Sequence, residues 1–229
     1  MTDTVSKFPR RDIRLAMTVF GDLLPAQELQ HFRGAMIKIA ENHPLFHNHA
    51  GGGYEYRYPR IQYKLFDGHP AVLGIEEGAT LLKDIFSSGQ TIRCRIGRHD
   101  TSLTVASLGE WQEEIGMSDA AHTYAIENWL PLNEGNFRQF RQAEGMISRI
   151  DLLQRIMVGN ILSFAKGMGL YFDSEVKCLI QQLKEKPAMT YKGVGLLEFS
   201  ASFTTNIRLP QWIGLGKSAS QNHGIIIHL

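Results

Sequence analysis

The segment IQYKLF-Asp67-Gly68-HPAVLGI, residues 61–75, constrains the fold more than any other stretch of the chain. Asp-Gly is a residue pair that fits the left-handed positions of a two-residue hairpin turn. The runs on either side are rich in apolar and aromatic residues and are long enough to form strands. The segment therefore predicts two antiparallel strands joined by a tight turn.

The residues before this hairpin predict one strand and one helix. Residues 12–20 (DIRLAMTVF) alternate apolar residues with others, which is the period of a strand. Residues 23–42 include Pro25, a favoured residue in the first turn of a helix. Apolar residues then recur at helical spacing, which predicts an amphipathic helix. They are Leu29, Phe32, Met36 and Ile39.

The remainder of the first half predicts further strands around a second helix. Residues 43–49 (HPLFHNH) form a short segment that we interpret as a strand. Residues 76–86 begin with two glutamates, which suit a helix N-terminus, and we expect this helix to stop near Gly89. Residues 91–97 and 102–108 have strand character again. The order of strand, helix, strands, helix and strand fits an α+β ferredoxin-like domain.

The second half predicts a similar arrangement after a polar stretch, EWQEEIGMSD, in which we place a domain boundary near residue 117. The two expected domains are residues 1–117 and 118–229. An extended segment is followed by a long amphipathic helix, by strands and by a loop rich in glycine. The expected elements are the extended segment 122–132, the helix 136–166, the strands 176–183 and 188–204, and an apolar terminal strand at 225–229.

Composition excludes a few classes of protein and leaves the function open. The formal net charge is +1, so the chain lacks the strongly basic balance of many dedicated nucleic-acid binders, although a local basic face is compatible with it. No apolar run approaches the roughly 20 residues of a membrane-spanning helix. The start MTDTVSKFPRRD lacks the apolar centre of a signal peptide. With only Cys94 and Cys178, we expect no disulfide framework and a cytoplasmic setting.

Two histidines, one residue apart, give the clearest chemical signal. On a strand, His47 and His49 would point to the same face. One imidazole could take a proton from an attacking hydroxyl while the other supplies one to the leaving oxygen, because the histidine pKa is near neutrality. No metal or other cofactor is needed if the nucleophile is a hydroxyl of the substrate itself. The alternative is that both histidines are solvated loop residues.

Three further interpretations of the histidines stay open. His43 precedes Pro44 and is either a third member of the site or a helix-end histidine whose charge suits the helix C-terminus. His43, His47 and His49 could instead bind zinc or nickel, but no cysteine or nearby acidic residue completes the ligand set. The letters His-Asn-His also occur in a metal-dependent nuclease motif, but that motif spreads its residues over a much longer segment.

The segment YEYRYPRIQYK interleaves aromatic and basic residues. On a strand, Tyr54, Tyr56 and Tyr58 could stack on bases while neighbouring cations hold phosphates, a combination used to recognise single-stranded RNA. The alternative is a sheet whose tyrosines pack on a helix and whose basic residues are solvated, and we expect such packing for Ile61 and Tyr63. The candidate RNA contacts are Arg57, Arg60 and Lys64.

The loop from Gly214 to Ser218 is a candidate phosphate site. Glycine allows close approach of the backbone to a ligand, and successive amides of such a loop can bind phosphate oxygens. The loop is not a nucleotide-binding P-loop, because it lacks the four residues that separate the glycines there. The alternative is a tight connection between strands. The candidate phosphate contacts are Gly214, Gly216, Lys217 and Ser218.

Several blocks of the chain resemble a known family of RNA-processing enzymes. They are FHNH followed by YRYPRIQYKLFDGHPAVLGIEEGATLL, then YAIENWLPLNEGNFRQF, RIMVGNILSFAKGMGLYF and YKGVGLLEFSASFTTNIRLPQWIGLGKSAS. From about residue 11 to residue 220, the chain resembles the CRISPR-repeat-processing endoribonucleases of the repeat-associated mysterious protein superfamily, in the branch with paired histidines near the end of the first helix. LPQWIGLGKS is the most specific block, and GNILSFAKG gives further support.

This resemblance implies two tandem ferredoxin-like (RRM-like) domains and an enzyme that cuts CRISPR precursor transcripts once per repeat. It implies metal-independent attack by the ribose hydroxyl on the neighbouring phosphate, which leaves a 2′,3′-cyclic phosphate and a 5′-hydroxyl. His47 and His49 would be the catalytic pair, and the basic tyrosine segment and the glycine loop would hold the CRISPR repeat RNA. Other subunits of a CRISPR effector complex and a second copy in a homodimer are further partners, whereas no membrane partner is expected.

One departure from the family pattern keeps other functions open. The glycine loop usually ends in an Arg-Gly-Phe-Gly-like stretch, where this chain has Gln221-Asn222-His223-Gly224. Asparagine tolerates left-handed backbone better than most residues, so the turn can persist while the grip on RNA is altered. The departure leaves a non-catalytic repeat-RNA-binding subunit as the second interpretation. A structural protein of a CRISPR effector complex is the third.

Overall fold

The computed structural model describes residues 8–47, 58–186, 189–191 and 194–229. The chain divides into two compact units, each of which combines antiparallel strands with helices. The N-terminal unit comprises Asp12–Glu113 and Ser220–Asn222. The C-terminal unit comprises Met1–Arg11, Glu114–Ala219 and His223–Leu229.

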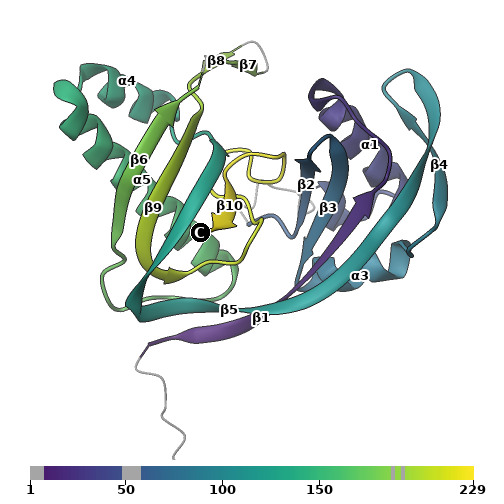
Figure 1. Ribbon diagram of the computed structural model, residues 1–229, viewed down its shortest axis with the longest axis horizontal. Coiled ribbons are helices and arrows are strands. Elements are labelled where there is room, and N and C mark those ends of the chain that lie inside the picture. Colours follow the sequence, from purple (N-terminus) through teal and green to yellow (C-terminus); the bar gives the residue numbers. More distant parts are fainter. Residues whose placement is uncertain (1–7, 48–57, 187–188, 192–193) are drawn as a thin grey trace, which may run out of the picture. The chain divides into compact units, whose positions relative to one another are not determined.

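An antiparallel sheet with the strand order β2-β3-β1-β5 forms the N-terminal unit, and β4 also pairs with β5 (Figure 1). The strands are β1 (Arg10–Phe20), β2 (Ile61–Phe66), β3 (His69–Ile75), β4 (Thr91–Ile96) and β5 (His99–Trp129), of which the first and last continue into the C-terminal unit. The predicted strands at the start of the chain and at residues 91–97 are thereby confirmed. The predicted helices are also present, as η1 (Ala26–Glu28) leading into α1 (Leu29–Ile39), and as α3 (Glu77–Ile85).

The hairpin predicted from Asp67-Gly68 is confirmed. Ile61 pairs with Gly74 and Phe66 pairs with His69, which leaves a two-residue turn. Asp67 and Gly68 have φ angles of 49° and 85°, the left-handed conformation that this turn requires at both positions.

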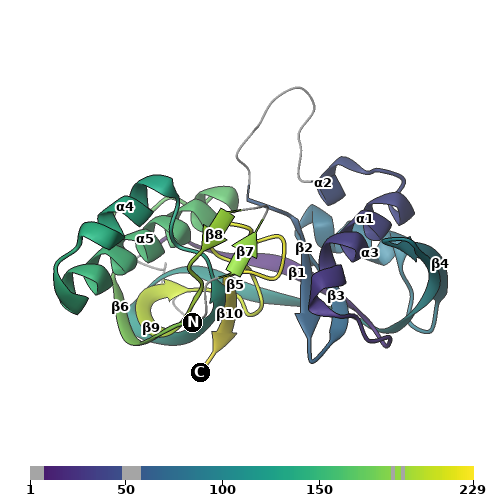
Figure 2. The same ribbon diagram turned by 90° about the horizontal axis from the view of Figure 1, so that it is seen from above.

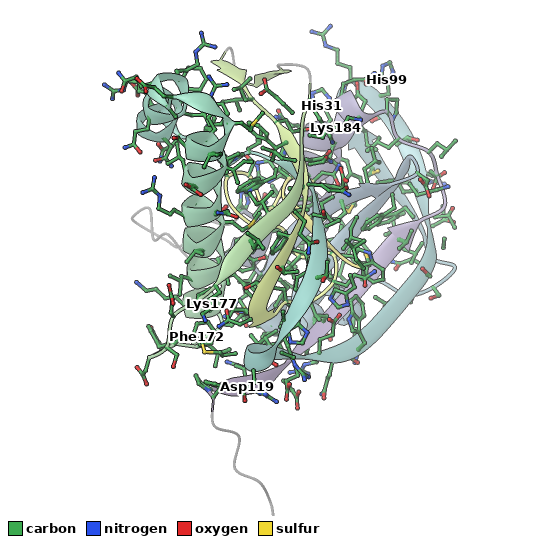
Figure 3. The ribbon with its side chains drawn as sticks, turned by 60° about the vertical axis from the view of Figure 1, so that its left-hand side comes forward. His31, His99, Asp119, Phe172, Lys177 and Lys184 are labelled. Carbon is green, nitrogen blue, oxygen red and sulfur yellow. The ribbon has the colours of Figure 1, made fainter. Side chains whose placement is uncertain are left out.

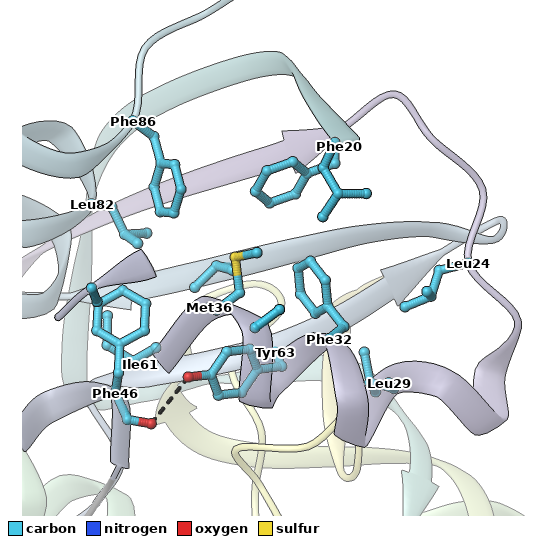
Figure 4. Close-up of a cluster of buried hydrophobic side chains, with 14 of the residues drawn as sticks. Phe20, Leu24, Leu29, Phe32, Met36, Phe46, Ile61, Tyr63, Leu82 and Phe86 are labelled. Carbon is cyan, nitrogen blue, oxygen red and sulfur yellow. Dashed lines mark hydrogen bonds between the residues drawn. The ribbon is translucent and has the colours of Figure 1, made fainter. Parts of the chain in front are cut away.

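Aromatic rings fill the core between this sheet and its helices (Figure 4). The ring centre of Phe20 lies 5.5 Å from that of Phe32 and 5.7 Å from that of Phe86. The ring centres of Phe32 and Tyr63 are 6.2 Å apart, and all three pairs have edge-to-face geometry. Tyr63 of β2 has no exposed surface. As expected, its ring packs on a helix, which is α1.

The strand predicted at residues 43–49 is wrong for its described part, which is the short helix α2 (Pro44–His47). The backbone reverses at the end of α1 because Glu41 and Asn42 are both left-handed, with φ angles of 50° and 60°. The amide of Leu45 then donates to Nδ1 of His43 at 3.3 Å, which caps the new helix. Neither the reversal nor the cap is visible in the hydrophobic pattern.

The C-terminal unit has a sheet in the order β5-β9-β6, and β10 pairs with β5. Helix α5 packs against β6, as the two perpendicular views show (Figures 1 and 2). The new strands are β6 (Cys178–Glu185), β7 (Met189–Tyr191), β8 (Val194–Leu196), β9 (Phe199–Arg208) and β10 (Ile225–His228), and the helices are α4 (Glu134–Gln142) and α5 (Gly145–Gly167).

Two predictions for this unit need correction. The single helix expected over residues 136–166 is broken into α4 and α5, because Ala143 and Glu144 are extended and Gly145 has a φ of 77°. The single strand expected over residues 188–204 is divided into the β7–β8 hairpin and the long strand β9. The strands predicted near Cys178 and at the C-terminus are present.

The polar stretch EWQEEIGMSD lies inside β5, which continues through it. The pairing of β5 with β9 shifts register between Met117 and His122, so this part of the strand is irregular. We keep residue 117 as a predicted domain boundary. Within the described residues, no helix combines the length and the apolar character needed to cross a membrane.

Candidate functional site

His47 is the last residue of α2, and two side chains hold the end of this helix. Nη2 of Arg33 donates to the carbonyl oxygen of His47 at 3.0 Å. The hydroxyl of Tyr63 donates to the carbonyl oxygen of Phe46 at 3.0 Å (Figure 4). His47 is helical, so it does not share one face of a strand with His49 as predicted. His49 lies outside the described residues.

The environment of Tyr63 keeps its hydroxyl protonated. Burial raises the pKa of Tyr63, and the nearby charge of Arg33 opposes this only in part. The Arg33 guanidinium lies 6.0 Å from the centre of the Tyr63 ring. Nε of Arg33 is buried and has no hydrogen-bond partner among the described residues. Arg33 and Tyr63 were not predicted as site residues, since their sequence context marks them only as members of a helix and a strand.

The described residues do not bring a metal site together. Among them, no group of three or more histidine, cysteine, aspartate or glutamate side chains is placed to bind an ion. His43 caps α2 through its ring nitrogen, which is a structural role at a helix end. The trio that includes His49 lies partly outside this part of the chain.

The candidate RNA contacts near β2 occupy different environments. Nε of Arg60 lies 3.0 Å from a carboxylate oxygen of Glu77, at the start of α3. Lys64 has no exposed surface, and burial lowers its pKa to about 7. A side chain with no exposed surface cannot contact RNA without a structural change, so this assignment stays a prediction. Arg57 lies outside the described residues, together with Tyr54 and Tyr56.

The glycines of the loop at Gly214–Ser218 are required by packing. A Cβ on Gly214 would clash with the carbonyl oxygen of Ala219. Gly216 has a φ of 84°, and a Cβ there would lie 2.6 Å from Oδ1 of Asn160. That oxygen accepts a hydrogen bond of 3.0 Å from Nε1 of Trp129, which is fully buried. The blocks around Asn160 and Gly216 that carry the family resemblance are therefore neighbours in space.

The outer part of the same loop is open to solvent. Lys217 is exposed, and it lies between two left-handed residues, Gly216 and Ser218, the latter with a φ of 58°. Within the described residues, no hydrogen bond engages the backbone amides of Gly216, Lys217 and Ser218. A concave run of such amides beside a cation can accept an anionic oxygen.

The departure at Gln221–Gly224 preserves the turn. Asn222 has a φ of 61° and Gly224 a φ of 64°. A Cβ on Gly224 would overlap the carbonyl oxygen of Leu215, so this position requires glycine. Oδ1 of Asn222 accepts from the amide of Leu65 at 3.0 Å, and its own amide donates to the carbonyl of Tyr63 at 2.9 Å. The expectation that asparagine tolerates this conformation is confirmed.

A polar cluster around His223 was not predicted from sequence. Nδ1 of His223 lies 3.1 Å from the carbonyl oxygen of Asn128 and 3.4 Å from a carboxylate oxygen of Glu198. Lys186 lies 3.3 Å from Glu198 and 3.4 Å from Glu127. Burial alone would raise the pKa of Glu198, but His223 and Lys186 outweigh it and lower that pKa. These residues come from distant segments and share no motif.

The C-terminal unit also has two hollows. One, of about 660 Å³, is lined by Phe8, by part of the irregular stretch of β5 and by Thr204–Asn206. The other, of about 930 Å³, lies between α5 and residues 172–178, and Figure 3 shows Phe172 and Lys177 near the C-terminal end of that helix. None of the predicted site residues that the structure describes lines either hollow.

Comparison with known proteins identifies the same family for both halves of the chain. Residues 13–114 match the family model for the Cas6b N-terminal domain, and residues 116–229 match the model for the Cas6b C-terminal domain. Uncharacterized protein MJ0978 of Methanocaldococcus jannaschii is 28% identical over 118 residues, which is 51% of this chain and 79% of that protein.

Solved structures of similar fold cover nearly the whole chain. One described as a crystal structure of Cas6b is 26% identical, with a TM-score of 0.82, and the match covers 96% of this chain and 100% of that chain. Another, described as the CRISPR RNA processing endoribonuclease Cas6b, has the same coverage at 24% identity and a TM-score of 0.71. Thermus thermophilus Cas6 is 10% identical, with a TM-score of 0.51 and coverage of 96% and 99%. The last two show a likeness of fold alone, and together the matches confirm an α+β fold of two tandem ferredoxin-like domains.

Proposed function

Because the chain belongs to the Cas6b family, we propose that it is an endoribonuclease that cuts CRISPR precursor transcripts within each repeat. The observation that carries this proposal is the match of both family domains in order, from residue 13 to residue 229. The solved structures described as Cas6b and as a CRISPR RNA processing endoribonuclease cover the same length.

The proposed chemistry is metal-independent transesterification. The ribose 2′-oxygen next to the scissile phosphate forms a bond to phosphorus while the bond from phosphorus to the 5′-oxygen breaks. One histidine accepts the proton of the 2′-hydroxyl, and the other, protonated, donates a proton to the departing 5′-oxygen. The products are a 2′,3′-cyclic phosphate and a 5′-hydroxyl. His47 and His49 are our candidates for the two roles.

The glycine loop is the proposed phosphate contact. Exposed Lys217 and the amides of Gly216 and Ser218, to which no described residue hydrogen bonds, offer a cation and several donors at one place. Gly214 shapes the loop rather than exposing a group of its own, because it is buried. Arg57, Arg60 and Lys64 are proposed as further contacts. Arg60 would exchange Glu77 for a phosphate, and Lys64 would contact RNA only after a structural change that exposes it.

The proposal is tested by incubating the protein with its neighbouring CRISPR repeat RNA in excess chelator. We expect one cut per repeat by the wild-type protein and none by the His47→Ala, His49→Ala double variant. His99→Ala, at the exposed first residue of β5, is the matched control and should cut like the wild type. Folded wild-type protein that binds the repeat without cutting it would reject the nuclease.

The altered stretch Gln221–Gly224 motivates a second candidate, a non-catalytic subunit that binds repeat RNA. It predicts repeat binding that is unchanged in the double histidine variant and no products at any time. We further propose a cytoplasmic protein whose other partners are a second copy or other subunits of a CRISPR effector complex. Sedimentation of the protein with and without RNA distinguishes a monomer, a homodimer and a chain that needs partners.

A further inference from the structure

We propose that Arg33 and Tyr63 are positioning residues that hold His47 for catalysis by fixing the end of α2. This inference rests on the proposed role of His47 and deepens it. The two residues act on the backbone of the histidine segment, one from helix α1 and the other from strand β2.

The need for anchoring follows from the length of α2. A helix of four residues has no downstream turn, so its last carbonyl groups lack partners within the helix. The carbonyls of Phe46 and His47 are two such groups, and they receive hydrogen bonds from Tyr63 and Arg33, each 3.0 Å long. Two consecutive peptide groups at the histidine are therefore fixed by side chains from elsewhere in the fold.

The anchors are themselves held by packing. The Tyr63 ring is fully buried and packs edge to face on Phe32, and its hydroxyl stays a donor because burial raises its pKa. Arg33 lies against the same ring, and its Nε is buried. A packed side chain that donates a hydrogen bond restricts the position of the carbonyl group that accepts it, and small displacements of a catalytic group matter for the rate.

The backbone of Tyr63 is fixed in turn by residues that follow the glycine loop. Its amide donates to the carbonyl of Ser220 at 2.8 Å, and its carbonyl accepts from the amide of Asn222 at 2.9 Å. One residue of β2 thus links the altered stretch after the loop to the segment that carries His47. Hydrogen bonds thereby connect Asn222 to the residue whose hydroxyl holds the end of α2.

The test uses variants that delete single donors. Tyr63→Phe removes only the hydroxyl, Arg33→Met removes the guanidinium but keeps the stem, and Arg33→Lys keeps a donor at the end of the side chain. Lys38→Met, on an exposed position of the same helix α1, is the matched control. Single-turnover cleavage at saturating enzyme is compared with the Kd for a non-cleavable repeat RNA and with the unfolding temperature.

We expect Tyr63→Phe and Arg33→Met to slow single-turnover cleavage about tenfold to a hundredfold, because displacement of a catalytic group by about 1 Å has effects of this size. The Kd should stay within about twofold of the wild type. Arg33→Lys should recover part of the rate, and Lys38→Met should cut like the wild type. Wild-type rates in Tyr63→Phe and Arg33→Met, with His47→Ala inactive, would overturn the positioning role alone.

Other outcomes separate this inference from the proposed function. Equal losses of rate, RNA affinity and unfolding temperature in both variants, without recovery in Arg33→Lys, would show a purely structural role and overturn the inference. Full activity of His47→Ala would overturn the assignment of His47, and the positioning role with it. A wild-type protein that does not cut would overturn the proposed function first.

Discussion

Asn222 holds a left-handed backbone conformation and uses its side chain at the same time. Its φ is 61°, and its Oδ1 accepts from the amide of Leu65. A β-branched residue in this conformation costs about 1–2 kcal/mol, whereas glycine adopts it freely. Asn222→Val should therefore be less stable than Asn222→Gly by about that amount in urea unfolding. Equal stability of the two variants would show that the backbone does not require this conformation.

Lys64 makes the free energy of unfolding depend on pH. Burial lowers its pKa to about 7, whereas an unfolded lysine titrates near 10.5. Below pH 7 both states carry the proton, so Lys64 adds no pH dependence there. Between pH 7 and about 10 the unfolded chain binds more protons, so stability rises with pH. In Lys64→Met this contribution is absent, and the free energy of unfolding should rise less steeply over that range. Parallel curves for the two proteins would contradict the burial of a titrating amine.

Among the elements, the break between α4 and α5 can be tested with two glycine substitutions, one at the break and one inside α5. Gly145 has a φ of 77°, and no atom lies within 4 Å of a Cβ placed on it. Gly145→Ala should therefore destabilise the protein by about 1 kcal/mol through the backbone alone. Gly159 is exposed inside α5 and also has free space around it, so Gly159→Ala should stabilise by up to about 1 kcal/mol. The same sign of change in both variants would contradict the assigned break.

The elements also show where sequence reasoning succeeds. The β2–β3 hairpin was predicted in full, because Asp67-Gly68 fixes both the turn and the register of the flanking strands. Helix α2 was missed because two consecutive non-glycine residues, Glu41 and Asn42, are left-handed. The break before Gly145 was missed because the apolar stripe runs through it. Local periodicity reports burial and not the conformation of single residues.

For the candidate site, the sequence predicted candidate catalytic and binding residues but not the residues that hold them in place. His47 and Lys217 were predicted from motif and resemblance. Arg33 and Tyr63 belong to no motif that marks a catalytic site. Only the tertiary structure shows that their side-chain donors bind the end of α2. Lys64 has the sequence context of a solvated cation and yet is fully buried. Its position in the alternation of β2 could not distinguish these environments.

At the scale of the whole molecule, distant segments combine in ways that no local pattern predicts. Ser220–Asn222 belong to the N-terminal unit, although the segment Glu114–Ala219 of the other unit directly precedes them in the chain. They pair with β2 through the bridge between Tyr63 and Gln221. Only the resemblance of several blocks in order predicted the function, because it reports on the whole chain at once. The two Cas6b domain matches confirm that resemblance.

The proposed nucleophile belongs to the RNA, so it can be removed while the protein stays intact. A repeat RNA with one 2′-deoxy nucleotide at the mapped cut site lacks the proposed nucleophile but keeps every phosphate. We predict that the wild-type protein binds this RNA with unchanged affinity and does not cut it at that position, in the presence or absence of chelator. Cleavage of the 2′-deoxy RNA at the same bond would show that another nucleophile attacks the phosphate and would contradict the proposed mechanism.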